Sequence, residues 1–190
     1  MQTFIAHART FPHRVGQRRH RFARLASGQR PQALFISCSD SRVVPALITA
    51  AEPGDIFELR SVGNIVPPYR PDAACAVASA VEFAVASLDV SDIVVCGHSH
   101  CGAVQAMTEG TTLPSVGRWL AHAAHRPAPT ADPVAVTQQH ILTQLAHLRR
   151  YPVVAARLGE GRLRLHAWYY TVDTGEVLAH RPGTADFGPL

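Results

Sequence analysis

Three short apolar runs constrain the fold of this 190-residue chain more than any other feature. They span residues 33–38, 55–60 and 92–98, and the first and last show no polar alternation. Such runs are typical of strands that are buried on both faces of a parallel sheet. Because stretches of helical character separate them, we predict an α/β fold in which helices flank a central, mostly parallel β-sheet.

Helical patterns and turn residues extend this outline on both sides. Residues 1–27 predict two helical pieces, with a break at Pro12 and a stop at Gly28. A turn signal at 173–175 follows a stretch of period-two alternation. The remaining elements are expected as helices at 73–88, 101–108 and 133–151, a linker at 122–133, and a strand at 163–172 that extends one edge of the sheet.

Length and composition predict a single domain over 1–190, with an N-terminal helical arm at 1–30 and a loose tail at 183–190. The 47% of hydrophobic and 17% of charged residues exclude a disordered chain. No apolar stretch reaches the roughly 18 residues of a membrane span. The first residues also lack the apolar run of a secretory signal. We therefore expect no membrane partner and a cytoplasmic location.

All 18 basic side chains are arginines, and seven of them precede the first predicted strand. These seven are Arg9, Arg14, Arg18, Arg19, Arg21, Arg24 and Arg30. Such a cluster occurs in nucleic-acid-binding proteins, and equally on a solvated helix face or on an arm that lies on a partner subunit. Because no aromatic interleaving and no DNA-binding motif accompany it, we predict no nucleic-acid partner.

The four cysteines are of two kinds. In a cytoplasmic chain with a sufficient core, metal binding or catalysis is a better explanation for cysteines than disulfides. Cys75 lies in a predicted apolar helix and Cys96 in a predicted buried strand, where a small thiol packs like alanine or valine. Cys38 and Cys101 instead follow the ends of two predicted strands and have polar neighbours.

Polar residues collect where these two strands end. The motif Cys-Ser-Asp-Ser-Arg occupies 38–42, and His-Ser-His-Cys-Gly occupies 98–102. The carboxyl ends of parallel strands meet at one edge of a sheet, and this edge is where α/β proteins bind ligands. The sequence therefore predicts that the two motifs form one site.

Two thiolates and one imidazole are a ligand set that suits Zn²⁺. Three protein ligands leave open the fourth position that a catalytic zinc site needs. We predict one Zn²⁺ per chain, bound by Cys38, His98 and Cys101. His98 is preferred to His100, because His100 adjoins Cys101 and would point to a different side.

Both motifs resemble those of the β-class carbonic anhydrases. The resemblance covers nearly the whole chain, through Gly28-Gln29, Pro53-Gly54, Arg60-Ser61-Val62-Gly63-Asn64, Val81-Glu82-Phe83-Ala84-Val85 and His166-Ala167-Trp168. It implies a carbonate dehydratase, a lyase in which a zinc-bound hydroxide reversibly hydrates CO₂ to bicarbonate and a proton. It also implies a homodimer or homotetramer whose N-terminal helices embrace the partner. Composition and spacing alone lead only to a zinc hydrolase or hydratase.

Asp40 and Arg42 are the predicted catalytic residues. The Asp40 carboxylate can accept the hydrogen of the hydroxide, and Arg42 can hold Asp40 through a charge-assisted pair. The family implies the same dyad. In some members the aspartate leaves its arginine and becomes the fourth zinc ligand, and we predict that Asp40 can adopt this closed state.

The resemblance also implies a substrate pocket. Phe57, Val62 and Phe83 would form its apolar wall, while Gln29 and the backbone N–H of Gly102 would face the substrate oxygens. From the sequence alone, the three apolar residues are equally compatible with a core, and Gln29 with a turn. The histidine that carries the proton to buffer stays open among His100, His122, His125 and His140.

Certain bacterial relatives hold an inhibitory bicarbonate with a Trp, an Arg and a Tyr. Arg60 and Tyr170 match the last two, but Phe35 stands at the Trp position and lacks the indole donor. We therefore do not predict bicarbonate regulation.

Two alternative functions remain open. Carbonyl sulfide and carbon disulfide hydrolases share this fold and these zinc motifs. A catalytically silent, zinc-stabilised scaffold is the other alternative. The intact Asp40 and Arg42 argue against the scaffold, since a structural zinc favours four Cys or His ligands.

Overall fold

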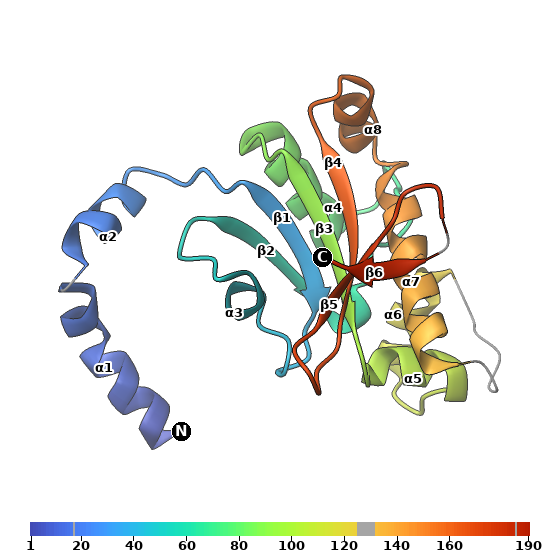
Figure 1. The fold of residues 1–190 in the computed structure, drawn as a ribbon, viewed down its shortest axis with the longest axis horizontal. Helices are drawn as coiled ribbons and strands as arrows, with labels where there is room; N and C mark the ends of the chain where they lie inside the picture. Colours follow the sequence, from blue (N-terminus) through green and yellow to red (C-terminus); the bar gives the residue numbers. More distant parts are fainter. Residues whose placement is uncertain (17, 125–131, 185) are drawn as a thin grey trace. The chain divides into compact units, whose positions relative to one another are not determined.

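The computed structural model describes residues 1–16, 18–124, 132–184 and 186–190, which divide into two units, Met1–Arg30 and Pro31–Leu190 (Figure 1). Most of the linker predicted at 122–133 lies outside the described residues. No helix in the described ranges is long and apolar enough to cross a membrane.

The N-terminal unit contains two helices, α1 (Gln2–Gly16) and α2 (Arg19–Leu25). The predicted break at Pro12 is wrong, since Pro12 lies inside α1. A proline removes one helix hydrogen bond without ending every helix, and α1 ends instead at Gly16, a poor helix former. Neither helix has a buried residue within the chain, and the rings of Phe11 and Phe22 meet edge to face at 6.1 Å.

The second unit is built on a six-stranded sheet of order β2-β1-β3-β4-β5-β6. Its strands are β1 (Ala33–Cys38), β2 (Ile56–Ser61), β3 (Asp92–His98), β4 (Arg164–Tyr170), β5 (Val177–His180) and β6 (Phe187–Pro189). The first four in this order pair in parallel, and β5 and β6 are antiparallel. The predicted fold class, a mostly parallel sheet flanked by helices, is therefore confirmed.

The predictions for the C-terminal third need two corrections. The strand predicted at 163–172 is β4, but it lies inside the sheet, because the turn at 173–175 returns the chain as β5 along its outer side. The tail predicted as loose at 183–190 contains β6, which pairs with β5.

The helices of this unit are α3 (Pro45–Thr49), α4 (Ala76–Glu82), α5 (Gly102–Glu109), α6 (Pro114–Leu120), α7 (Pro133–Leu148) and α8 (Pro152–Gly159). Three shorter elements join them, the 3-10 helices η1 (Val62–Asn64) and η3 (Ala121–Ala123) and the π-helix η2 (Phe83–Ser87). The helix predicted at 73–88 begins only at Ala76, so Cys75 is its N-cap, half-buried and packed against the edge of the main apolar cluster. Asp132 caps α7 by accepting from the backbone N–H groups of Val134 and Ala135.

Apolar side chains cover both faces of the parallel strands. On one face, strand residues such as Ile36 and Val95 pack with Val81 and Ile141 from the covering helices. On the other face, Phe35, Val94 and Cys96 pack with Trp168. Cys96 is fully buried, as predicted, and burial raises the pKa of its thiol to about 12. These layers fix the strand ends that carry the candidate site.

Asp92, the first residue of β3, connects β3 to β4 at the end of the sheet opposite to His98. Its carboxylate accepts from Arg164 through Nε and Nη2, both at 2.7 Å, and lies 2.8 Å from His166 Nε2. The Arg164 guanidinium holds the pKa of this carboxyl well below its usual range. This contact stabilises the fold above the pKa of the unfolded aspartate, about 3.9, and is lost as the pH falls toward the lower folded pKa.

Asp92→Asn is expected to lower the free energy of unfolding by about 2 kcal/mol at pH 7, because the buried carboxylate is the charged acceptor shared by Arg164 and His166, and an amide replaces it only in part. At pH 3 the loss should be about 1 kcal/mol smaller, since the wild-type carboxylate then contributes less. Urea unfolding of both proteins at both pH values measures this difference. Asp89→Asn is the control, because Asp89 pairs with Arg157 and Arg162 at the surface, where ion pairs contribute little. An equal loss at both pH values would contradict the assignment.

Candidate metal centre

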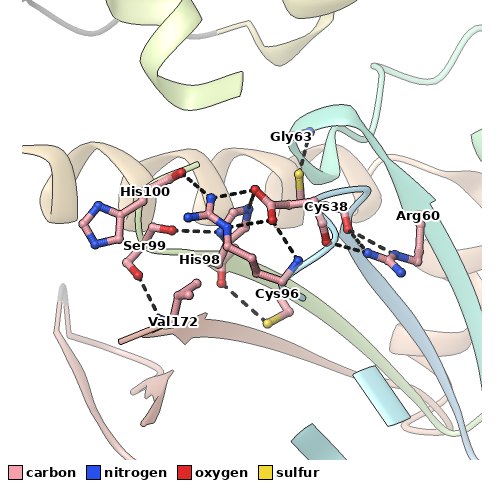
Figure 2. A network of polar contacts seen from close by, with 11 residues as sticks. Cys38, Arg60, Gly63, Cys96, His98, Ser99, His100 and Val172 are labelled. Atoms are coloured by element: carbon pink, nitrogen blue, oxygen red, sulfur yellow. Dashed lines mark hydrogen bonds and ion pairs between the residues drawn. The ribbon is translucent and has the colours of Figure 1, made fainter. Parts of the chain in front are cut away.

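Three buried side chains meet where β1 and β3 end. Cys38 is the last residue of β1, His98 is the last residue of β3, and Cys101 directly precedes α5. Their ligand atoms all lie within 4.8 Å of one another. Figure 2 shows Cys38 and His98 together with Ser99 and His100, the first residues of the loop that follows β3. The structure thus brings together the three side chains that the sequence analysis selected as metal ligands.

His98 presents the nitrogen that a metal would bind. Its Nδ1 lies 2.8 Å from the carbonyl oxygen of Ser99, and because a carbonyl only accepts, Nδ1 carries the hydrogen. Nε2 is fully buried and has no hydrogen-bond partner among the described residues. A buried imidazole lone pair without a partner is costly, and a metal ion would satisfy it.

The two thiols perturb each other. The hydrogen bond from Cys101 lowers the pKa of Cys38 well below that of a free thiol, and contacts with His98 and the backbone N–H of Gly63 act in the same direction. The pKa of Cys101 is raised by the Cys38 thiolate and by burial. The pair therefore releases one proton readily and retains the second, and a cation between the two sulfurs would favour release of both. Two buried sulfurs beside an unpartnered imidazole fit Zn²⁺.

The loop that carries His98 and Cys101 is fixed by its own backbone. The N–H of Ser99 donates to the Tyr170 carbonyl, and the Ser99 hydroxyl accepts from the N–H of Val172, both at 2.9 Å (Figure 2). His100 has a left-handed backbone, with φ of 56°, and its exposed ring lies 3.0 Å from Asp173. The ring of His100 therefore points away from the cluster, as expected.

Asp40 and Arg42 form a two-pronged ion pair beside the cluster. Arg42 Nε and Nη2 donate to the two oxygens of Asp40 at 2.9 and 2.7 Å, and the Arg42 backbone N–H donates at 3.0 Å. The guanidinium holds the pKa of Asp40 well below its usual range. Asp40 Oδ2 lies 3.9 Å from His98 Nε2, so this carboxylate faces the candidate metal position while it stays bonded to Arg42.

Arg60 has a role that the sequence analysis missed. It donates from Nε and Nη2 to the Cys38 carbonyl at 3.2 and 3.0 Å, and from Nη2 to the Asp40 carbonyl at 2.8 Å (Figure 2). These bonds fix the backbone between the first metal-ligand candidate and the carboxylate. Phe35, which stands at the position predicted to correspond to the Trp of the bicarbonate pocket, is fully buried against Trp168.

The five predicted substrate residues come from several elements and differ in exposure. The rings of Phe57 and Phe83 lie 5.9 Å apart, and Val62 and Phe83 are each almost half exposed. Gly102 is the first residue of α5, next to Cys101, and a Cβ there would meet nothing within 4 Å. Gln29 belongs to the N-terminal unit. The roles of these five residues stay predictions.

The four candidate proton carriers also differ in placement. His100 and His122 are exposed, and His125 lies outside the described residues. His140 is fully buried, with Nε2 at 2.7 Å from the Gly63 carbonyl, so its side chain does not reach solvent and this one of the four candidates is disfavoured. The sequence showed its position on an amphipathic helix but not which face is covered.

Comparisons with known proteins agree with this arrangement. Residues 33–177 match the family model described as carbonic anhydrase. A carbonic anhydrase of Pseudomonas aeruginosa is 48% identical over 168 residues, which cover 82% of this chain and 76% of that protein. Among solved structures, the β-carbonic anhydrase CcaA matches with a TM-score of 0.91 and 39% identity, over 100% of this chain and 99% of that one. One of the two tetrameric β-carbonic anhydrases of Sordaria macrospora matches with a TM-score of 0.80 and 26% identity, over 96% of each chain.

Proposed function

The chain belongs to the β-class carbonic anhydrase family of lyases, and from this premise we propose that it hydrates CO₂ reversibly to bicarbonate and a proton with one Zn²⁺ per chain. The observation that carries the proposal is the buried Cys38, His98 and Cys101 cluster, with the Asp40–Arg42 pair beside it. When bound there, Zn²⁺ would supply the nucleophile by lowering the pKa of a water molecule to near neutrality.

Asp40 would orient this nucleophile. Because Arg42 keeps the Asp40 carboxylate ionised, its oxygens can only accept hydrogen bonds. An acceptor at this place would accept a hydrogen bond from the nucleophile and leave an oxygen lone pair directed toward the substrate. Arg42 would hold the carboxylate in that orientation, since its Nη2 is itself fixed on the His100 carbonyl at 2.9 Å. In the alternative closed state, Asp40 would leave Arg42 and occupy the fourth metal position.

The substrate would meet apolar side chains and a few donors. CO₂ has no net charge, so an apolar wall built from Phe57, Val62 and Phe83 suits it. The backbone N–H of Gly102 would bind one of its oxygens, and the role of Gln29 stays a prediction from the resemblance. Protons would reach buffer through His100 or His122, both of which are exposed.

We propose that the chain assembles as a homodimer or homotetramer. The helices α1 and α2 have no buried residue of their own, and they expose large apolar side chains such as Phe4 and Phe11. Exposed apolar faces of this kind mark protein contacts. The Sordaria macrospora relatives are tetramers. The cytoplasmic location and the absence of a nucleic-acid partner stay predictions.

Stopped-flow CO₂ hydration tests the proposed function. We expect the zinc-loaded protein to be active between about pH 6.5 and 9, with a rate that rises with pH. Removal of the metal by a chelator should abolish the activity, and added Zn²⁺ should restore it.

Carbonyl sulfide hydrolysis, followed as sulfide release, is assayed beside CO₂ hydration. A protein that binds one zinc per chain without hydrating CO₂ would overturn the proposal. Sulfide release by that protein would indicate the carbonyl sulfide hydrolase, and inactivity toward both substrates the silent scaffold.

A further inference from the structure

We infer that Trp119 and His140 are positioning residues that hold the backbone N–H of Gly63 on the Cys38 sulfur, although neither is a candidate metal ligand. The inference rests on the metal site of the proposed function. It assigns to two helices outside the cluster, α6 and α7, the control of how strongly one thiolate donates electrons to the metal.

Gly63 is the point of contact with the cluster. Its N–H donates to Cys38 Sγ at 3.3 Å (Figure 2). Its φ of 71° lies in the left-handed region, and a Cβ at this position would lie 2.8 Å from the Cβ of Ala103. Glycine is therefore required both for the backbone conformation and for the space. Because glycine has the most backbone freedom, the direction of this N–H must be fixed by neighbouring groups.

Trp119 fixes the peptide group that contains this N–H. Its indole Nε1 donates to the Val62 carbonyl at 2.8 Å. The Val62 carbonyl and the Gly63 N–H belong to the same peptide group, so a donor on the oxygen polarises the N–H at the other end. The indole thus both orients and strengthens the hydrogen bond to Cys38.

His140 fixes the peptide group on the other side of Gly63. Its Nε2 lies 2.7 Å from the Gly63 carbonyl, which can only accept, so Nε2 carries the hydrogen. The opposite nitrogen, Nδ1, lies 3.3 Å from Gln144 Nε2 and accepts from it. Gln144 is oriented in turn, because its Oε1 accepts from the Val66 N–H at 3.0 Å. Both peptide groups that flank Gly63 are therefore held by side-chain donors.

The same face of α7 provides an internal comparison. His147 Nδ1 lies 2.6 Å from the Val66 carbonyl, and the Tyr151 hydroxyl, just beyond α7, donates to the Pro67 carbonyl at 2.9 Å. These residues are buried like His140 and bind the extended segment that directly follows η1. They do not bind the peptide groups next to Gly63. A general anchoring role would make His140 and His147 equivalent, whereas the positioning role makes them different.

The chemical consequence concerns the thiolate. A hydrogen bond to a ligating sulfur draws electron density away from it, which leaves the metal a stronger Lewis acid. A Cys₂His site needs such help more than a three-histidine site, because two thiolates cancel the charge of Zn²⁺. Loss of the hydrogen bond from either Trp119 or His140 would let the Gly63 N–H turn away from the sulfur. Cys38 would then donate more electron density to the metal.

Cobalt substitution tests the inference without relying on activity. Trp119→Phe keeps an aromatic ring but removes the indole N–H, and His140→Leu removes the imidazole donor on the Gly63 carbonyl. In the Co²⁺-loaded proteins, both variants should shift the sulfur-to-cobalt charge-transfer band to longer wavelength at unchanged metal content. In the zinc-loaded proteins, kcat/KM for CO₂ should fall about tenfold, the lower end of the range for outer-shell hydrogen bonds.

His147→Leu is the matched control, expected to lower the melting temperature without moving the band. His140→Gln, which retains a donor, should restore the band at least in part. An unmoved band in Trp119→Phe would overturn the inference, and so would an equal shift in His147→Leu. If the parent cobalt protein shows the band but the zinc protein hydrates no CO₂, the proposed function fails while the band comparison still decides the positioning role.

Discussion

Cys38→Ser is expected to remove zinc binding and CO₂ hydration together. Serine is nearly isosteric, but its hydroxyl stays protonated near neutral pH and does not replace a thiolate as a zinc ligand. The variant also leaves the unpartnered Nε2 of His98 facing a single cysteine. We expect zinc affinity to fall by more than about 100-fold, beyond the range typical of outer-shell substitutions. Zinc content after dialysis against a chelator, read beside stopped-flow rates, measures both effects.

Cys75→Ser is the matched control for this variant. Cys75 is half-buried at the N-cap of α4 and is not among the ligand cluster of the described residues. It should keep one zinc per chain and the parental rate. Stoichiometric zinc in Cys38→Ser would show that the metal, if bound, uses another ligand set. Loss of zinc in both variants would point to a general loss of folding and not to a ligand.

The ligand cluster was predictable because it depends on local pattern and one topological rule. The runs 33–38 and 92–98 become β1 and β3 with the predicted boundaries. Parallel strands place their carboxyl ends at one edge, so the residues that follow must meet. The bond between Asp40 and Arg42 is equally local, since only Ser41 lies between the partners along the chain. Neither inference required knowledge of distant contacts.

The surroundings of the cluster were not predictable, because they depend on which surfaces become covered. Trp119 and His140 lie 57 and 77 residues along the chain from the carbonyls they bind. The sequence does carry a signal for His140, since it shares the inner face of its helix with other polar residues, Gln144 and His147, and with apolar ones such as Ile141. Polar residues on the buried face of a helix need partners, and a search for them could have revealed the segment after Asn64.

The C-terminal strands show a different limit. β5 has four residues and β6 three, too few for period-two alternation to be distinguished from a loop. Their pairing is decided by the exposed edge of β4, which needs a partner for its backbone groups. The tertiary context therefore overrides a local sequence that resembles a tail.

Asp40→Asn is expected to separate catalysis from metal binding. The three candidate ligands are untouched, so zinc content should match the parent protein, in contrast to Cys38→Ser. The rate of CO₂ hydration should fall by about 10²–10³-fold, the loss typical when one preorganised hydrogen-bonding group is removed from an active site. An amide can turn its NH₂ donor toward the nucleophile, and it no longer forms a charged pair with the guanidinium of Arg42.

The pH profile adds a test of this assignment. Arg42 holds the pKa of Asp40 well below its usual range, so Asp40 stays ionised from about pH 6.5 to 9. The rise of the parental rate over that interval must then come from another group, and the residual rate of Asp40→Asn should rise with a similar midpoint. Arg42→Lys should lose less than Asp40→Asn, because lysine keeps the charge but not the two-pronged contact. A full parental rate in Asp40→Asn would remove the carboxylate from the mechanism and leave the metal ligands as the whole of the catalytic site.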